Sequence, residues 1–181
     1  AQKKLLSSPL IEEAKVRFLK DGQIQVSYRH VTPFALLADF NNVGIDSFGK
    51  IFPVKPFLSP KGLVKVFLGI DSCRDSLNIS DYKEKTRWDF ALKMLKEIYS
   101  LQINGDILAL DVSKIEERSL GKSEVVLTIE YPERKDILRL TKRNYLNELG
   151  HYIILCDKLS CESQVCMIDL RHGDQALIEK F

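Results

Sequence analysis

Cysteine and histidine are the residue types in this chain that are best suited to metal binding or nucleophilic catalysis. Three of the four cysteines, Cys156, Cys161 and Cys166, follow one another at intervals of five residues, and the fourth is Cys73. Structural zinc sites favour more closely spaced cysteine pairs with a further ligand nearby. The spacing misses that pattern, so neither a metal nor another cofactor is predicted.

The three clustered cysteines leave two interpretations open. In an oxidising compartment, two of Cys156, Cys161 and Cys166 are able to form a disulfide. Cys161 lies in the short link between a predicted helix and a predicted strand, so it is placed to reach either neighbour. In a reducing compartment the same residues are expected to be free cysteines, half buried on the helix and the strand.

One Cys–His nucleophile pair is conceivable, but its geometry is poor. His151 and Cys156 fall on one predicted helix, where five positions correspond to a rotation of roughly 140°. The other histidines, His30 and His172, follow a strand and occupy a turn. The common sequence motifs of nucleotide-binding proteins, serine hydrolases and metalloproteases are missing. We therefore predict that the protein is not an enzyme.

Composition limits the class of protein. The chain has 181 residues, of which 45% are apolar and 29% charged, so a packed core with a soluble surface is expected. The net charge of +2 does not by itself indicate nucleic acid or an anionic membrane as a partner. No apolar run is long enough to span a bilayer, and the N-terminus is too short for a signal peptide. The chain is expected to be cytosolic or a soluble part of a larger protein.

Hydrophobic periodicity predicts which elements position these residues. Apolar residues recur at helical spacing over residues 87–101 and 144–159, and Thr86 is placed to cap the first of these helices. A short helix is expected at residues 2–6. Alternating apolar residues predict strands. The predicted strands span residues 13–19, 23–29, 43–45, 50–52, 63–69, 107–112, 124–130 and 136–140.

These elements predict an α+β fold. Residues 1–35 form a helix and a hairpin, and residues 36–181 form a mostly antiparallel, curved sheet with two packed helices. The chain ends in a second hairpin, with Gly173 and Asp174 in its turn. A terminal hairpin tends to leave its last strand at a sheet edge, where unpaired backbone groups can accept a strand from another protein. Asp169 and Arg171 share one face of the hairpin and predict a weak surface ion pair.

Four segments, in order along the chain, resemble the bacterial cell-division family FtsQ, also called DivIB. Residues 9–17 resemble the end of the second helix and the next strand of the family's POTRA module, and residues 23–29 with 33–35 resemble its last strand. The segment IDSFGKIF at residues 45–52 resembles the opening of the family's β domain, and residues 168–171 with 176–178 match its closing hairpin. Tyr28 stands where the family usually has Glu, and His172 stands where an aromatic residue is often found.

The resemblance implies a non-enzymatic scaffold of the divisome, with a partial POTRA module at residues 1–35 and a β domain at residues 36–181. Members of the family sit in the cytoplasmic membrane through a single transmembrane helix, and these domains lie on the extracytoplasmic, periplasmic side. The membrane anchor and the first strand and helix of the POTRA module have no counterpart in the sequence. We therefore expect a truncated extracytoplasmic piece of a membrane protein.

The resemblance also implies the partners. FtsB (DivIC)-like and FtsL-like membrane proteins and other divisome proteins are expected, with a role in regulating septal peptidoglycan synthesis. In that family a partner segment adds to the last strand, and a basic residue near the terminal hairpin pairs with a partner acid. The partner-binding residues carried over are Arg171, His172, Gln175, Ala176, Leu177 and Ile178. The alternative is a POTRA-type accessory for outer-membrane protein assembly or transport. Nucleic acid is not expected as a partner.

Overall fold

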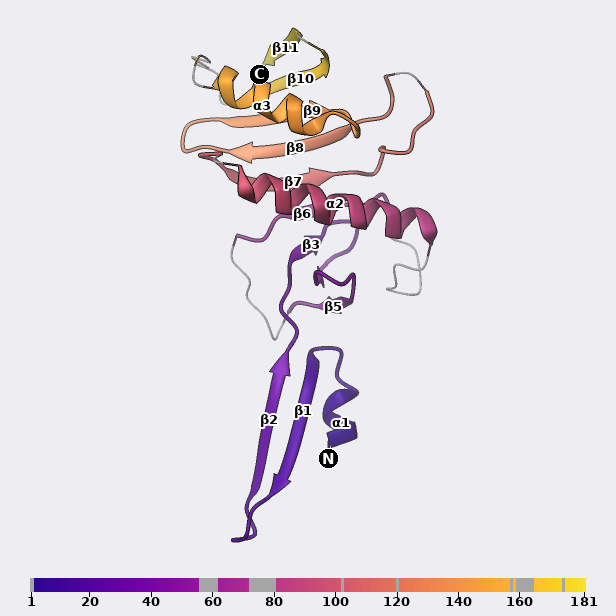
Figure 1. Cartoon of the computed structure of the whole chain (residues 1–181), viewed down its shortest axis with the longest axis vertical. Coiled ribbons are helices and arrows are strands. Elements are labelled where there is room, and N and C mark those ends of the chain that lie inside the picture. Colours follow the sequence, from indigo (N-terminus) through magenta and orange to yellow (C-terminus); the bar gives the residue numbers. More distant parts are fainter. Residues whose placement is uncertain are drawn as a thin grey trace.

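The computed structural model describes residues 2–55, 62–71, 81–101, 103–119, 121–156, 158, 165–173 and 175–181. A narrow two-stranded piece projects from a wider body of sheet and helices, so the outline is elongated (Figure 1). The terminal hairpin lies at the opposite end of the molecule from this projection (Figure 1). The α+β fold class expected from the sequence is confirmed.

The projecting piece contains helix α1 (Gln2–Leu6) and the antiparallel strands β1 (Ile11–Phe18) and β2 (Ile24–His30). Helix α1 packs beside β1, where the Gln2 side-chain amide donates to the Ala14 carbonyl oxygen at 2.8 Å. The larger sheet begins with β3 at Ala35, so the predicted boundary between residues 35 and 36 falls inside that strand. The division into two domains stays a prediction.

A nine-stranded sheet forms the body, in the order β11-β10-β9-β8-β7-β6-β3-β4-β5. It is mixed: β6 pairs in parallel with both β3 and β7, β9 and β10 are parallel, and the other neighbours are antiparallel. The strands are β3 (Ala35–Leu37), β4 (Val43–Ile45), β5 (Ile51–Pro53), β6 (Lys65–Phe67), β7 (Asp106–Asp111), β8 (Val125–Glu130), β9 (Lys135–Leu140), β10 (Val165–His172) and β11 (Gln175–Lys180).

Both longer helices are crossovers between parallel strands. Helix α2 (Tyr82–Ser100) connects β6 to β7, and α3 (Tyr145–Cys156) connects β9 to β10. These four strands run in the same direction, and both crossovers step toward β11. Because such crossovers are right-handed, both helices must cover the same face of the sheet. The sequence predicted the helices and their packing on a face, but not the parallel pairing that they bridge.

Helix α2 begins earlier than the periodicity indicated. Asp81 is its N-cap, with a side chain that accepts a hydrogen bond from the Lys83 backbone N–H. The expectation that Thr86 caps the helix is wrong, since its hydroxyl donates to the Tyr82 carbonyl one turn back inside the helix. The first turn is polar except for Tyr82, which is exposed, so it carries little of the apolar periodicity that marks the rest of α2.

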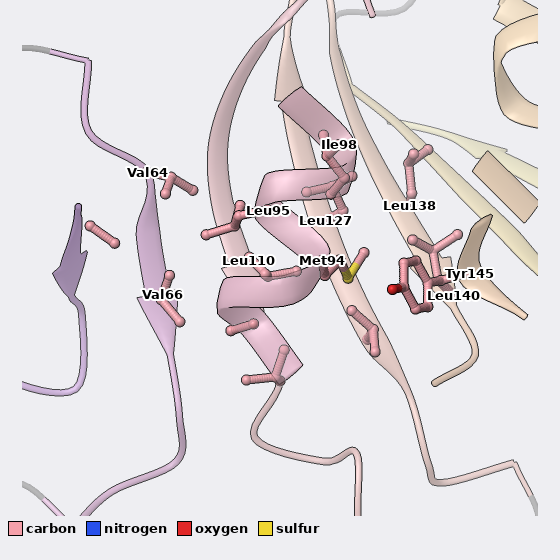
Figure 2. Close-up of a cluster of buried hydrophobic side chains, with 14 of the residues drawn as sticks. Val64, Val66, Met94, Leu95, Ile98, Leu110, Leu127, Leu138, Leu140 and Tyr145 are labelled. Atoms are coloured by element: carbon pink, nitrogen blue, oxygen red, sulfur yellow. The ribbon is translucent and has the colours of Figure 1, made fainter. Parts of the chain in front are cut away.

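The core lies between the helices and the covered face of the sheet. Alternate residues of β8 and β9 point into it, and α2 contributes a stripe of buried side chains from the other layer (Figure 2). The Tyr145 hydroxyl donates to Glu97, which ties the start of α3 to α2. The central side chains are Val64, Val66, Met94, Leu95, Ile98, Leu110, Leu127, Leu138 and Leu140 (Figure 2).

Candidate functional site

The terminal hairpin forms one edge of the nine-stranded sheet. Strand β10 lies between β9 and β11, and β11 is the last strand in the order. The turn contains Gly173 at a φ of 70°, a conformation that favours glycine over residues with a side chain. The sequence-based expectation of a hairpin that ends in an edge strand therefore agrees with the observed topology.

The register of the hairpin shows which backbone groups of β11 face outward. The Phe181 N–H donates to the Val165 carbonyl oxygen at 3.0 Å, just past the end of β11. In an antiparallel pair, successive residues turn their backbone groups alternately toward and away from the partner strand. Leu177 and Glu179 thus pair with β10, whereas Ile178 and Lys180 direct their N–H and C=O groups away from the sheet.

The side chains of β11 are mostly exposed. Leu177 and Ile178 keep 55% and 37% of their surface accessible, and Gln175 is exposed as well. Ala176 differs, because it packs against the core on the covered side of the sheet. The edge thus offers free backbone groups together with exposed apolar side chains, which is the combination that strand addition requires.

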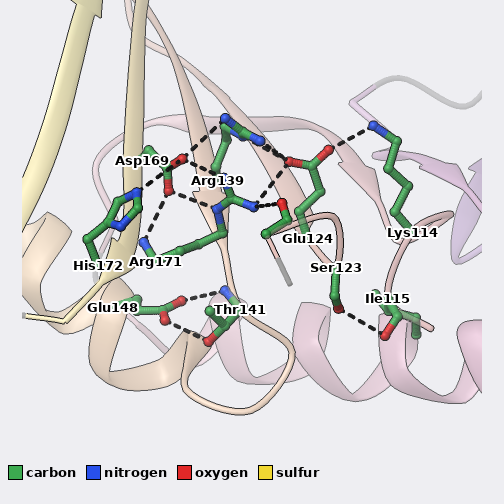
Figure 3. A network of polar contacts seen from close by, with 11 residues as sticks. Lys114, Ile115, Ser123, Glu124, Arg139, Thr141, Glu148, Asp169, Arg171 and His172 are labelled. Carbon is green, nitrogen blue, oxygen red and sulfur yellow. Dashed lines mark hydrogen bonds and ion pairs between the residues drawn. The ribbon is translucent and has the colours of Figure 1, made fainter. Parts of the chain in front are cut away.

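Arg171 lies inside a dense set of contacts rather than on an open surface (Figure 3). Its Nε and Nη2 atoms bond to the two carboxylate oxygens of Asp169 at 2.9 and 2.7 Å. Its Nη1 atom donates to the Gly121 carbonyl oxygen at 2.9 Å. The side chains of Arg171 and Asp169 are only 12% and 10% exposed, so the expectation of a weak surface ion pair is wrong. The role of Arg171 in partner binding stays a prediction that these contacts do not favour.

The Arg171–Asp169 pair belongs to a charge network that joins β9, β10 and the connection between β7 and β8 (Figure 3). Its members are Lys114, Glu124, Arg139, Asp169 and Arg171. Arg139 on β9 bonds to Glu124 at 2.6 Å and lies 3.2 Å from Asp169 on β10. Lys114 bonds to Glu124 from the loop after β7 at 2.8 Å. The network thus fixes β10, and through it the hairpin, to the sheet and to the neighbouring loop.

The pKa values of the two carboxylates reflect this network. Burial alone would raise the pKa of Glu124, but hydrogen bonds from Lys114 and Arg139 outweigh it and hold the pKa below its ordinary value. The same balance holds for Asp169. Burial raises its pKa, but the hydrogen bonds from Arg171 have the larger effect and hold the pKa below its ordinary value. The hydrogen bond to Asp169 raises the pKa of Arg171. All three groups are therefore charged at neutral pH.

His172 lies beside the network at the start of the turn. Its side chain is 50% exposed, and its Nε2 atom is 3.9 Å from an Asp169 oxygen. Among the six predicted partner-binding residues, His172, Gln175, Leu177 and Ile178 are available at the surface. These four lie at the same edge, so a single partner segment can contact all of them.

Glu148 supports the site in a way that the sequence-based reasoning missed. This carboxylate is 3% exposed, and it accepts hydrogen bonds from the Thr141 N–H at 2.7 Å and from the Thr141 hydroxyl at 2.6 Å. The bonds join the end of β9 to the first turns of α3. The seven-residue separation of Thr141 and Glu148 matches no capping motif, so the sequence offered no signal for this pair.

A second polar cluster surrounds Cys156 at the other end of β9. The Tyr152 hydroxyl donates to the Asp136 carboxylate at 2.6 Å, and Arg134 bonds to the same carboxylate and to the Cys156 sulfur. Burial raises the pKa of Tyr131 to about 12, and burial and the bond to Asp136 raise the pKa of Tyr152 as well. The tyrosines are therefore neutral hydrogen-bonding groups that hold α3 against β9.

The predicted disulfide between two of Cys156, Cys161 and Cys166 stays a prediction. The Cys156 thiol is free, and Cys166 is fully buried on β10. Cys73 and Cys161 lie outside the described residues, so the predicted pairing with Cys161 has no structural description. His151 is exposed and lines a groove of about 470 Å³ beside Gly173, whereas Cys156 contacts the tyrosine cluster. The structure thus places the two members of the conceivable Cys–His pair in different surroundings.

One broad, open cavity of about 1160 Å³ lies between α2, the start of α3 and the loop after β7. Two of its hydroxyl groups have structural partners, since Ser123 donates to the Ile115 carbonyl and Thr141 donates to Glu148. Its described lining contains no cysteine or histidine. Within the described part of the chain, no three His, Cys, Asp or Glu side chains are grouped to hold a metal ion.

Comparison with the models of known protein families and with curated proteins found no match to this sequence. The fold and the position of β11 therefore define the class of protein. It is an α+β protein whose sheet ends in an exposed edge strand. No helix among the described residues has the length and apolar character needed to cross a membrane.

Proposed function

We propose that this protein is a non-enzymatic divisome scaffold of the FtsQ/DivIB type, held on the extracytoplasmic side of the cytoplasmic membrane. It binds FtsB (DivIC)-like and FtsL-like partners by strand addition at β11, and so takes part in regulating septal peptidoglycan synthesis. The observation that carries the proposal is the position of β11 as the exposed, last strand of the sheet. The four matching segments of the sequence support the choice of family.

Strand addition at this edge has a definite geometry. The incoming strand pairs with the outward N–H and C=O groups of Ile178 and Lys180, as a tenth strand of the sheet. The backbone bonds supply affinity without regard to sequence. Specificity then comes from side chains, and the exposed Leu177 and Ile178 favour apolar residues on the incoming segment.

The charge network makes this edge rigid before the partner arrives. Arg139, Asp169 and Arg171 join β9, β10 and the loop at Gly121, so β10 holds β11 in position. A preformed edge lowers the ordering cost of association. In this account Arg171 positions the hairpin, whereas the half-exposed His172 and the exposed Gln175 are the polar residues available to a partner side chain.

A proline substitution tests the proposal because proline has no N–H to donate. Ile178→Pro removes an outward N–H that β10 does not use, so the fold is expected to remain intact. We expect binding to an extracytoplasmic fragment of an FtsB (DivIC)-type protein from the same genome to weaken by at least about tenfold. Isothermal titration calorimetry measures the affinity, and circular dichroism checks the fold.

Ile178→Ala is the matched control for this experiment. It removes most of the same side chain and keeps the outward N–H, so it separates backbone pairing from side-chain packing. The proposal requires the alanine variant to bind clearly better than the proline variant. Equal affinities for the two folded variants would mean that the partner does not pair with this edge.

A further inference from the structure

The broad cavity between α2, the start of α3 and the loop after β7 is lined by basic side chains. Its described lining contains four of them: Lys93, Arg118, Lys142 and Arg143. They come from three segments that lie far apart in the sequence, so only the fold brings them to one site. We call this site the basic cavity. Its described lining includes no residue of β11, so it is separate from the proposed docking edge.

The positive charge of the basic cavity is only partly compensated. Arg118 and Arg143 are exposed, and neither has an ion-pair partner within the described part of the chain. The lining contains two carboxylates, Glu116 and Glu117, and a Glu116 oxygen already lies 3.9 Å from Nε of Arg87. The excess of two positive charges at this one site is as large as the net charge of +2 on the whole chain.

An apolar wall lies beside these cations. The rings of Phe90 and Tyr145 meet edge to face with their centroids 5.5 Å apart, and the Lys142 Nζ atom lies 5.9 Å from the Phe90 centroid. Leu146, which is 45% exposed, lines the same cavity. The site therefore offers apolar contact and positive charge within reach of one ligand.

The size and openness of the basic cavity favour a chain segment over a small molecule. Its volume of about 1160 Å³ is above the range of roughly 300–1000 Å³ that is typical of pockets enclosing small ligands. A segment that lies across the cavity can contact α2, the loop after β7 and the start of α3 together. Nucleic acid fits less well, because Glu116 and Glu117 would repel its phosphates.

We propose that the basic cavity docks an acidic peptide segment of a partner protein, one that carries an apolar side chain between its carboxylates. The apolar side chain packs on Phe90 and Leu146, while the carboxylates accept hydrogen bonds from Arg118 and Arg143. Each exposed pair contributes little alone, so the cations act together, and they raise selectivity and the association rate more than affinity. The inference goes beyond the proposed function and does not depend on strand addition at β11.

Fluorescence anisotropy tests the proposal with a labelled probe peptide in which glutamates flank one phenylalanine. We expect the 181-residue chain to bind this probe, and to bind it more weakly as the salt concentration rises. Arg118→Ser/Arg143→Ser is expected to lower the affinity at least about tenfold, because it removes the two cations that have no ion-pair partner among the described residues. Lys93 is a less suitable target, since Glu97 already lies 3.9 Å from it.

Arg17→Ser/Lys20→Ser is the matched control variant. It removes the same amount of charge from the exposed β1–β2 hairpin, which lies far from α2 and α3 (Figure 1). At physiological salt the affinity of this variant should stay within about twofold of the wild type, because distant charges are screened.

A second control changes the probe instead of the protein. Exchanging the phenylalanine of the probe for alanine should weaken binding to the wild type severalfold, because the contact with Phe90 and Leu146 is lost. If the alanine probe binds as tightly as the phenylalanine probe, the site recognises charge alone and the apolar part of the proposal is wrong.

Three results would overturn the proposal as a whole. One is an absence of probe binding by the wild type. Another is equal affinity of the wild type and Arg118→Ser/Arg143→Ser. The third is an equal loss of affinity in this variant and in the hairpin control, which would mean that the probe responds only to the overall charge. Circular dichroism verifies each fold, which should persist because all four substituted side chains are exposed.

Discussion

Arg171→Glu is expected to lower the free energy of unfolding by about 2–4 kcal/mol, because it reverses a charge inside a nearly buried network. The substitution removes the two bonds to Asp169 and the bond to the Gly121 carbonyl. It also places a third carboxylate beside those of Asp169 and Glu124. In the native protein the Arg171 Nη1 atom lies 3.7 Å from a carboxylate oxygen of Glu124. Urea denaturation followed by circular dichroism measures the change.

His172→Ala is the neighbouring control. Its side chain is half exposed and lies at the limit of contact with Asp169, so the expected change in stability is within about 0.5 kcal/mol. If Arg171→Glu is as stable as this control, the network does not hold the hairpin in place. In that case Arg171 would again be available for the partner-selecting role suggested by the family resemblance.

Acid tests the same network by a second route. The folded-state pKa values of Glu124 and Asp169 are below their ordinary values, so the unfolded state binds protons more readily. Their contribution to stability is complete above the unfolded pKa values near 4, and it is lost as the pH falls through the lower folded values. Asp169→Asn should therefore reduce the acid sensitivity of unfolding relative to the wild type.

Trp88→Ala is expected to cost about 3–5 kcal/mol of stability, through lost packing and a residual cavity. Trp88 is 3% exposed on α2, meets the Phe34 ring edge to face at 6.3 Å, and lies against Gly49 in the turn between β4 and β5. Its indole N–H has no hydrogen-bond partner among the residues that the structure describes, so the expected loss comes from packing. Thermal unfolding measures the effect.

Tyr82→Ala on the same helix is the control for Trp88→Ala. Tyr82 is 82% exposed at the start of α2, so its loss should change stability little. Since Trp88 joins α2 to the end of the sheet opposite β11, binding at the β11 edge should persist in a Trp88→Ala protein that is still folded. A cost below about 1 kcal/mol would contradict the observed packing.

Local patterns in the sequence accounted for most of the elements. The apolar stripe of α2 and the alternation in β2, β8 and β9 predicted these elements because each pattern depends only on near neighbours. The parallel pairing of β6 with β7 was not predictable in this way. It depends on where a crossover helix returns the chain, which no short pattern records.

At the candidate site, too, the sequence predicted local features but not contacts between residues far apart in the chain. The edge strand followed from the turn at Gly173 and the alternation after it. The environment of Arg171 did not, because its partners include Gly121, fifty residues away along the chain, and a carboxylate shared with Arg139 on β9. The alternation of β2 was likewise visible in the sequence, but its nearly complete exposure depends on what packs against it.

Amide hydrogen exchange of β11, followed by NMR, tests the central claim most directly. The amides of Leu177 and Glu179 pair with β10 and should exchange slowly in the free protein, whereas those of Ile178 and Lys180 should exchange fast. With a saturating FtsB (DivIC)-type fragment, we predict that the exchange of Ile178 and Lys180 becomes slow. Binding that leaves both amides fast and protects a different surface would contradict strand addition at this edge.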